Sequence, residues 1–598
     1  MGLLTSINNA VSGIRVNQDS LNLVSKNIAN SGTPGYHRQS LSVIDYGNEA
    51  SSYARTSGVQ RAFNQSLQTY YTSQVSTASQ ASTKAAYLDR LQTFMGKPGS
   101  EGSLDTVYQN LKNAFETLSV SPDDHAARAE VVSKSQTFTG TLNRLWGNVR
   151  DMRLETETKM SSAVDDLNDM LTSLGDVNQR LQDVAASPDS RTMLLDRRDS
   201  LVSEIAEKID VRADYKLDGT VALRTKSGVG LIDGRVSRFS YESSGAVGEG
   251  RLMLTSPGGN KIDLAKQGGL QGGELAALVD LRDNTLAEAE AHLDQIAASL
   301  AQVFGTNTTE GDAATVGAAE GFDINLNDLE PGNDLLISYS ENGIDKQVRV
   351  VNTTKTVDYQ EPDGTRVLGV DIENLSTADV ALALGGQVSG LAFSDEGSGT
   401  LRVLDDGAAG TTNVNKVIAR ATSDGAQGDG LGLNLFTDGA RPFTRSLEGD
   451  PPQVAGFAGR IAVNPAVVAD NRLLVQYEAG GSLGESTRPD YLLAQLGNRD
   501  FASSPDAVGA DKGFKLSGTL GEIVTQTINY QGRNVATALG RQQDTSLALD
   551  TVTTQMQSEY GVNLDEEMAR LIELQNAYAA NARVISVVQE LMDRLLAI

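Results

Sequence analysis

Residues 564–595, LDEEMARLIELQNAYAANARVISVVQELMDRL, and residues 4–28, LTSINNAVSGIRVNQDSLNLVSKNI, decide the fold of this chain. In both stretches apolar residues recur at alternating intervals of three and four, which is the spacing of a coiled-coil seam. A helix with one narrow apolar stripe cannot bury that stripe alone. We therefore expect a helix at each end of the chain, and we expect the two helices to pair.

The seam positions are predicted to form an assembly interface. The N-terminal seam consists of Leu4, Ile7, Val11, Ile14, Gln18, Leu21, Ser25 and Ile28. The C-terminal seam consists of Leu564, Met568, Leu571, Gln575, Tyr578, Ala582 and Ile585, with Met592 and Leu595 beyond them. Gln18, Ser25 and Gln575 interrupt the apolar pattern, and polar seam residues lower the stability of a helix pair while setting its register.

Size and charge narrow the class of protein. A chain of 598 residues with 39% apolar residues exceeds one core, so several domains are expected. Residues 301–510 hold 30 Asp and Glu against 13 Lys and Arg, and they supply most of the net charge of −27. Such a field disfavours binding to nucleic acid or anionic lipid. The chain has no cysteine, which excludes disulfides and thiolate chemistry.

The sequence shows no membrane span and no secretory signal. It contains no run of 18 apolar residues, which is the length that would predict a membrane-spanning helix. The first residues, MGLLTSINNA, lack both a basic segment and a continuous apolar segment, so we expect no cleaved signal peptide.

Helical spacing extends through much of the remaining chain. Apolar residues keep intervals of three and four across residues 125–186, which predicts one long helix and a rod-like architecture. A second such stretch covers residues 273–304. Together these patterns assign residues 51–208, 265–308 and 515–560 to a helical stalk.

Two segments alternate as strands do. From Ile209 apolar and polar residues alternate on both sides of Asp218-Gly219, so residues 209–264 are predicted to be a β-hairpin insertion. Residues 309–514 are rich in Gly, Asp, Asn, Thr and Val and predict one or two acidic β-rich outer domains. Their turn sequences are Asn342-Gly343, Pro362-Asp363-Gly364 and Asp406-Gly407.

The order of segments predicts a multidomain α+β fold. It has a long helical-bundle stalk closed by N- and C-terminal coiled-coil helices, with inserted β-rich outer domains. Residues 1–50, a helix followed by an extended loop, would pair with residues 561–598 as an inner core domain. The loop is predicted because residues 31–35, SGTPG, are turn formers that end the first helix.

No residue pattern predicts a catalytic, metal or cofactor site. The glycine-rich residues 228–234 are not followed by a βαβ unit and are expected to flank a strand. Asp424 and Asp429 lack the spacing of a calcium loop. The remaining candidates are the widely separated His37, His125 and His292, and the pair Asp196 and Asp199, which we expect on an exposed helical run.

Four motifs resemble those of bacterial flagellar rod, hook and hook-associated proteins. The first is SKNIAN at residues 25–30 with TPGY at residues 33–36. Residues 561–585, from GVNLDEEMA through LQNAY to ARVI, resemble the C-terminus of the hook-associated proteins, as do LLDRRDSL at 194–201 and residues 272–283. The loop-motif residues are Asn27, Asn30, Thr33, Pro34, Gly35 and Tyr36. His37 stands where the family commonly has Ser.

The resemblance implies a structural subunit without catalytic, metal or cofactor residues. It would form a ring at the junction between hook and filament, and it would leave the cytoplasm through the flagellar type III pathway for an extracellular place on the flagellum. Implied partners are further copies of the chain, hook protein, a second junction protein, flagellin, the export apparatus and a cytoplasmic chaperone at the C-terminal helix. We also hypothesise that Asp196–Asp199 and Arg282–Asp283 carry subunit contacts on the stalk surface.

Three rival interpretations remain open from the sequence. The first is that the chain is another flagellar axial protein, such as hook protein or flagellin, since these also have paired terminal helices. Alternatively, residues 309–514 house an enzyme, which would require a cleft with converging carboxylates of raised pKa. A cytosolic coiled-coil scaffold is the third, and it predicts that both ends are ordered in the free chain.

Overall fold

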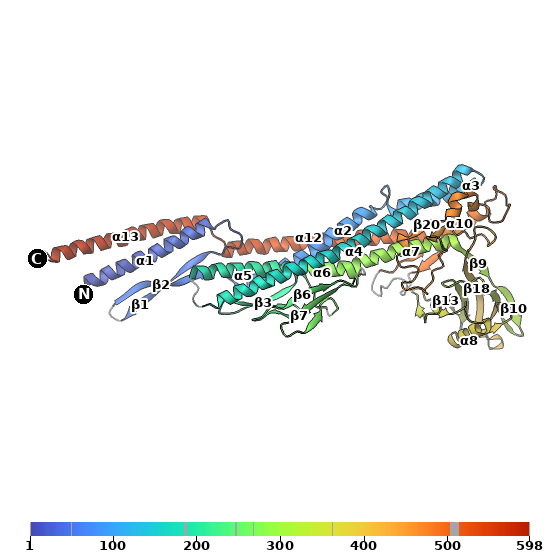
Figure 1. The fold of residues 1–598 in the computed structure, drawn as a ribbon, viewed down its shortest axis with the longest axis horizontal. Helices are drawn as coiled ribbons and strands as arrows, with labels where there is room; N and C mark the ends of the chain where they lie inside the picture. The colour runs from blue at the N-terminus through green and yellow to red at the C-terminus, as the bar shows by residue number, and fades with distance from the viewer. Residues whose placement is uncertain are drawn as a thin grey trace. The chain divides into compact units, whose positions relative to one another are not determined.

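The computed structural model describes residues 2–48, 51–183, 188–244, 248–266, 268–361, 363–502 and 514–596. The chain forms two compact units, each assembled from separate stretches of sequence (Figure 1). Unit 1 comprises residues 1–86, 155–280 and 537–598, and unit 2 comprises residues 87–154 and 281–536. Long helices and small sheets make up both units, which confirms the multidomain α+β class. In the parts of the chain just given, no helix is both long and apolar enough to cross a membrane.

Unit 1 contains both terminal helices. α1 (Gly2–Ala29) lies beside α13 (Leu564–Leu596), and both chain ends are found on this pair (Figure 1). α13 begins where it does because Asn563 caps it: Asn563 Oδ1 accepts the N–H of Asp565 at 3.0 Å. Acidic residues fill the first turn of α13 and complement the positive end of its dipole.

A β-hairpin, which the sequence patterns did not predict, follows α1. β1 (Gln39–Asn48) pairs antiparallel with β2 (Ser51–Arg61), and both strands contact α1. The assignment of residues 51–61 to a helical stalk is therefore wrong. The hairpin was missed because its strands are rich in Ser, Thr and Gly and show little apolar alternation.

Five further helices contribute to unit 1, three of them only in part. They are the first part of α2 (Gln65–Met95), the second part of α4 (His125–Leu181), α5 (Pro188–Lys208) and α6 (Gly273–Asp280), with the end of α12 (Leu520–Tyr560). α4 is one continuous helix of 57 residues, as its apolar spacing predicts. Its unit 1 part buries Met160, Leu167, Leu171 and Leu174.

Residues 209–264 fold into more than the expected hairpin. That hairpin is confirmed by β3 (Val211–Tyr215) and β4 (Val221–Thr225), whose turn uses Gly219 at φ +90°. β5 (Gly230–Ile232), inside the glycine-rich stretch, adds a third strand. A second three-stranded sheet holds β6 (Arg238–Glu242), β7 (Arg251–Thr255) and β8 (Lys261–Asp263).

In unit 2, helices surround the nearly completely buried α7 (Leu286–Gly305). A short π-helix, η1 (Leu281–Thr285), leads into α7, while α3 (Leu104–Val120) and α10 (Thr487–Asn498) pack near it. The Phe115 and Phe304 rings stack at 4.8 Å between centroids, and Phe304 also meets Phe436. The aromatic contacts join α3 and α7 to the segment beyond the sheets.

Two sheets enclose the apolar core of the acidic segment. The six-stranded sheet has the order β14 (Asp358–Gln360), β15 (Arg366–Val370), β13 (Ile344–Asn352), β12 (Asp334–Glu341), β18 (Thr412–Thr422) and β9 (Thr306–Glu310). The four-stranded sheet has the order β10 (Asp312–Val316), β11 (Ala319–Asn325), β17 (Thr400–Leu404) and β16 (Ala392–Asp395). α8 (Thr377–Gln387) packs on this core.

The predicted turns of the acidic segment have different outcomes. Asn342-Gly343 joins β12 to β13 with positive φ at both residues, as predicted. Asp406-Gly407 instead opens a short 3-10 helix, η2 (Gly407–Ala409), because the Asp406 carboxylate accepts the backbone N–H groups of Thr411 and Thr412. Pro362, in the third predicted turn, lies outside the described residues.

Residues 423–499 depart from the β-rich prediction. They contain only short strands and helices: β19 (Phe436–Asp438), η3 (Phe457–Gly459), β20 (Ile461–Val463), α9 (Pro465–Ala469), η4 (Asn471–Leu474) and α10. The buried Arg488 organises this segment by donating to the carbonyl oxygens of Ala426, Gly430, Gly432, Leu473 and Gln476. β21 (Asp500–Ala502) and β22 (Ser517–Thr519) pair beyond it.

Candidate assembly site on the terminal helices

The loop after α1 is organised by the buried side chain of Asn27. Its Nδ2 donates to the Gln39 carbonyl at 2.9 Å, and its Oδ1 accepts the Tyr36 hydroxyl at 2.8 Å. A buried amide whose oxygen and nitrogen are both hydrogen-bonded fixes the path of the chain around it. Asn27 therefore ties the end of α1 to the start of β1.

The rest of the loop motif forms consecutive turns, so the predicted extended loop is wrong. Asn30 Nδ2 donates to the Lys26 carbonyl at 2.8 Å, and the N–H of Thr33 donates to the Asn30 carbonyl at 3.0 Å. Gly35 has a φ of +75°, which favours glycine, and Pro34 is exposed. These local hydrogen bonds outweigh the tendency of Thr-Pro-Gly to extend the chain.

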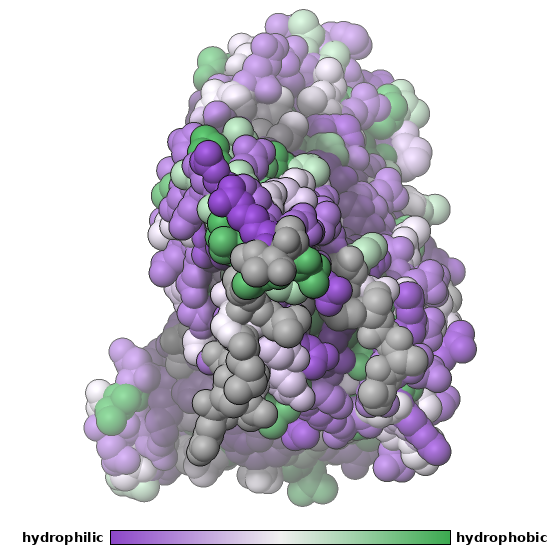
Figure 2. Space-filling view, turned by 90° about the vertical axis from the view of Figure 1, so that its left-hand side faces the viewer, coloured by the Kyte–Doolittle hydropathy of each residue, from purple (hydrophilic) through white to green (hydrophobic). Residues whose placement is uncertain are grey.

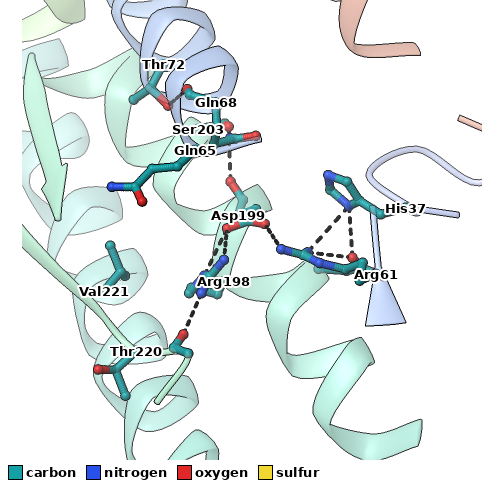
Figure 3. Close-up of polar contacts among 12 residues, drawn as sticks. His37, Arg61, Gln65, Gln68, Thr72, Arg198, Asp199, Ser203, Thr220 and Val221 are labelled. Atoms are coloured by element: carbon teal, nitrogen blue, oxygen red, sulfur yellow. Dashed lines mark hydrogen bonds and ion pairs between the residues drawn. The ribbon is translucent and has the colours of Figure 1, made fainter. Parts of the chain in front are cut away.

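A group of buried charges, here called the Arg61 cluster, joins the end of the hairpin to α5 (Figure 3). It consists of His37, Arg61, Asp196, Arg198 and Asp199. Arg61 Nη1 lies 2.8 Å from Asp196 Oδ1, and Arg61 Nη2 lies 2.6 Å from Asp199 Oδ2. Arg198 donates through Nε to the other oxygen of Asp199 at 2.9 Å. Each charge is thereby paired, as burial requires.

His37 is a member of this cluster rather than a residue of an exposed turn. It is buried, and its Nδ1 lies 2.9 Å from Asp196 Oδ1. Its ring packs against Tyr560 at 4.8 Å between centroids. The Ser that the family commonly has at this position could not make this ring contact, so the position has its own packing in this chain.

Tyr560, the last residue of α12, connects the same region to α13. Its carbonyl accepts the N–H of Arg38 at 2.7 Å, and its hydroxyl donates to the Asn64 carbonyl at 2.7 Å. Burial raises its pKa, so the hydroxyl stays protonated and available as a donor. The break between α12 and α13 is thus held at the same place as the motif loop and the hairpin end.

Burial contradicts part of the stalk-surface contacts that we hypothesised from the sequence. Asp199 and Arg282 are each 3% exposed. Asp199 is enclosed by the Arg61 cluster in unit 1, and Arg282 in unit 2 donates to its neighbour Asp283 at 2.5 Å. Asp199 and Arg282 support the interior of their own units and cannot carry the proposed contacts, whereas Arg197 and Asp283 are exposed.

The N-terminal seam is only partly covered in the single chain. Ile7, Val11, Ile14, Leu21 and Ile28 are half-buried, whereas Gln18 and Ser25 are exposed. The buried residues of α1 are Ala10, Ser20, Leu23, Val24 and Asn27, most of which lie beside the predicted stripe. The side chain of Leu4 lies outside the described residues.

The C-terminal seam divides into two faces of α13. Leu571, Ala582, Ile585 and Met592 are half-buried, whereas Leu564, Met568, Gln575, Tyr578 and Leu595 are exposed. Heptad spacing alone missed the close approach of the helices at Gly13, where an added Cβ would lie 2.8 Å from Asn581 Nδ2. It also missed Val588, which is buried. Small residues permit close helix packing, and a search for Gly and Ala at helical spacing is the signal that would have found this contact.

Exposed apolar side chains remain along the length of α13 on both sides of its buried face, and this set is here called the α13 stripe. Its members are between 37% and 59% exposed: Leu564, Met568, Ile572, Tyr578, Val584, Val587, Leu591 and Leu595. The hairpin adds the exposed Val43, Ile44, Tyr46 and Tyr53. Figure 2 views the molecule from the side of the helix ends and shows hydrophobic residues open to solvent among hydrophilic ones. Exposed apolar patches of this kind mark protein interaction sites.

Comparison with known proteins supports a flagellar role. A model of the helical domain of flagellar hook-associated protein FlgK matches residues 88–322, and a model of the C-terminal part of flagellar basal body rod FlgEFG proteins matches residues 553–598. Flagellar hook-associated protein 1 of Salmonella typhimurium is 24% identical over 99% of both chains, and that of Escherichia coli is 23% identical over 99% of both.

A solved flagellar hook junction protein, FlgK from Burkholderia pseudomallei, covers 82% of this chain and 100% of its own at 15% identity, with a TM-score of 0.45. The two curated relatives match end to end and are named as flagellar hook-associated proteins. Neither name is that of an enzyme, so the comparisons give no support to the enzyme interpretation of residues 309–514. Along nearly its whole length the chain is similar to flagellar hook-associated protein 1, and residues 88–322 match the helical domain of FlgK.

Proposed function

We propose that this chain forms the ring at the junction between hook and filament, and that it polymerises through its terminal helices. The observation that carries the proposal is the α13 stripe. α13 packs on α1 through one face and leaves apolar side chains exposed on both sides of that face. A second copy of the chain, hook protein or a following axial protein would cover these side chains in the assembled flagellum.

The energetics favour assembly over a free chain. Fully burying a Leu, Ile, Val or Met side chain contributes about 1.5–3 kcal/mol. The α13 stripe offers several such side chains per copy, and ordering the helices offsets part of their gain. The polar Gln18 and Gln575 are exposed in the single chain and limit how tightly the two terminal helices pair by themselves.

The same exposed side chains suit a cytoplasmic chaperone before export. An apolar helix face is a common site for groove binding by a partner. A chaperone that covered the α13 stripe would keep the chain from assembling in the cytoplasm until the flagellar type III apparatus exports it. The name of the family supports the junction location, and the helix geometry supports this mode of assembly.

Complementation of a flagellated species from which the gene for this protein has been deleted tests the proposal. Val587→Asp and Leu591→Asp place a charge in the α13 stripe, and both should abolish filament growth on hooks. Leu382→Asp is the matched control, because Leu382 is an apolar helical residue of α8 that is 77% exposed. It should leave filaments intact. Normal filaments with Val587→Asp and Leu591→Asp would refute assembly through this stripe, and normal filaments without the chain would refute the junction role.

A further inference from the structure

A polar cavity of about 890 Å³ lies in unit 2, beside the six-stranded sheet. Residues of β12, β13 and β18 form one wall, and residues 498–501 and 517–522 form another. Four arginines line it: Arg349, Arg420, Arg445 and Arg499. Such a concentration of guanidinium groups around one cavity is unusual in a segment whose net charge is strongly negative.

Two of these arginines already have carboxylate partners. Arg349 pairs with Glu361 at 2.5 Å, and Arg420 donates through Nε to Asp334. Burial opposes ionisation of Asp334, but Arg420 and Arg349 outweigh it and lower its pKa. These two ion pairs lie in the wall of the cavity. They engage its two buried carboxylates, Glu361 and Asp334.

Arg445 and Arg499 differ from the first pair. Arg445 Nη2 is buried and has no hydrogen-bond partner among the described residues, and neither has Arg349 Nε. Arg499 donates to the Gln302 carbonyl at 2.9 Å and stacks over the Phe501 ring, so these partners are neutral. Asp334 acts on both cations and Glu361 acts on Arg445, but these carboxylates offset burial only in part, since the pKa of each arginine remains lowered.

Neighbouring arginines act on both of these cations. Burial, together with the neighbouring Arg420 and Arg445, lowers the pKa of Arg499 to about 9. Burial lowers the pKa of Arg445 as well, with Arg349 as the next cause. An anion between Arg445 and Arg499 would remove this repulsion, which is the electrostatic pattern expected of an anion-binding site.

We propose that this cavity binds a small oxyanion with two negative charges, a phosphate monoester or a dicarboxylate, through Arg445 and Arg499. Planar guanidinium groups bind such oxygens with two parallel hydrogen bonds, which favours a multidentate anion over chloride. Neutral Gln347, Thr365 and Asn498 line the remaining surface and suit a polar group attached to that anion.

The carboxylates on the cavity lining restrict where the anion sits. Asp363 accepts the N–H of Thr365 at 2.9 Å, and Glu522 accepts the N–H of Thr519 at 2.9 Å. Asp500 also lines the cavity. These three carboxylates repel an anionic ligand. The position between Arg445 and Arg499 is therefore the favourable one for the anion.

Calorimetric titration of the purified full chain tests the proposal. Inorganic phosphate at pH 7.5 and succinate are the dianionic probes, and acetate and chloride at matched ionic strength are the monoanionic ones. We expect saturable binding of at least one dianion and at least tenfold weaker binding of acetate. Phosphate binding alone assigns a phosphate-type ligand, and succinate binding alone assigns a dicarboxylate.

Variants of the two arginines locate the site. Arg445→Gln and Arg499→Gln should each weaken dianion binding at least tenfold. Arg402→Gln is the matched control, because Arg402 pairs with Asp323 and Glu396 in the four-stranded sheet and does not line the cavity. It should stay within twofold of the unaltered chain.

Circular dichroism checks that each variant folds, and Arg499→Lys, which keeps the charge but loses the guanidinium fork, should bind with intermediate affinity. The proposal is overturned if neither dianion binds the unaltered chain. The proposal is also overturned if the Arg499→Gln and Arg402→Gln variants bind the dianion with equal affinity.

Discussion

Arg61 and Asp199 form an ion pair inside unit 1, with Nη2 2.6 Å from Oδ2 and side chains that are 4% and 3% exposed. The two residues are 138 positions apart, and their contact joins the end of the β1–β2 hairpin to α5. His37 and Tyr560 lie against the same cluster. The region where α1, the hairpin and the α12–α13 break meet is therefore held by buried charge rather than by apolar packing alone.

Arg61→Met should destabilise unit 1 by about 3 kcal/mol, because removing one partner leaves a buried carboxylate with incomplete pairing. The free energy of unfolding in urea measures the loss. Arg197→Met is the control on the helix that carries Asp199, since Arg197 and its partner Glu204 are 54% and 38% exposed. An exposed pair contributes less than about 1 kcal/mol. Equal losses in the two variants would contradict a special role for the Arg61 cluster.

Asp294 should make the stability of unit 2 depend on pH. Its carboxylate accepts the N–H groups of Gly456 at 2.7 Å and Ala458 at 2.8 Å, yet burial raises its pKa to about 7. The folded chain then holds the proton in a range where the unfolded chain has lost it. Stability therefore falls as pH rises from about 4 to about 7, by at most about 1.4 kcal/mol for each pH unit.

Asp294→Asn removes this titration. The quantity to follow is the unfolding free energy of the unaltered chain minus that of the variant. This difference should be largest near pH 4 and should decrease as the pH approaches 7. Glu290 and Arg460 act on Asp294 and are present in both proteins, so their own contributions largely cancel. A difference that stays constant from pH 4 to pH 7 would show that Asp294 has an ordinary pKa.

Arg488→Met should open residues 426–432 and 473–476, because five backbone carbonyl oxygens lose their donor. Burial lowers the pKa of Arg488 to about 10, but the side chain remains a cation at neutral pH. Hydrogen exchange should show loss of protection in these segments, with a total cost of about 3 kcal/mol or more. Arg472→Met, at a residue whose side chain is 58% exposed, should leave protection unchanged.

Gly13→Leu should separate the terminal helices. A Cβ at residue 13 would already lie 2.8 Å from Asn581 Nδ2, and overpacking of this kind costs about 1–3 kcal/mol. Helix content by circular dichroism should fall, and protease should remove residues 564–596 sooner. Gly140→Leu is the matched control, because an added Cβ there meets nothing within 4 Å. Similar behaviour of the two variants would argue against close packing at Gly13.

The sequence predicted helices and sheets where their periodicity is strong. The intervals of three and four gave α1, α13 and the continuous α4, and Asp218-Gly219 and Asn342-Gly343 marked their hairpins correctly. The hairpin after α1 was missed because polar strands show no clear alternation. Residues 423–499 were assigned wrongly because a single buried arginine, rather than a repeating pattern, organises them.

Contacts between distant residues were the least predictable part of the candidate site. Nothing in local spacing shows that Arg61 meets Asp199 or that Gly13 faces Asn581. The heptad positions of α13 were also divided between two faces, since Leu571 is half-buried while Leu564 and Leu595 are exposed. Which apolar residues a helix pair covers depends on where small residues let the backbones approach, and the seam pattern does not contain that information.

Chemical labelling of single cysteines tests assembly through the α13 stripe most directly, because the chain has no cysteine of its own. Val587→Cys and Leu591→Cys place a thiol in the stripe, and Leu382→Cys places one on the exposed face of α8. All three should react with a maleimide in the free chain. In isolated hooks with attached filaments, positions 587 and 591 should be protected while position 382 still reacts. Equal reactivity of 587 and 591 in the free chain and in the assembled flagellum would contradict the account.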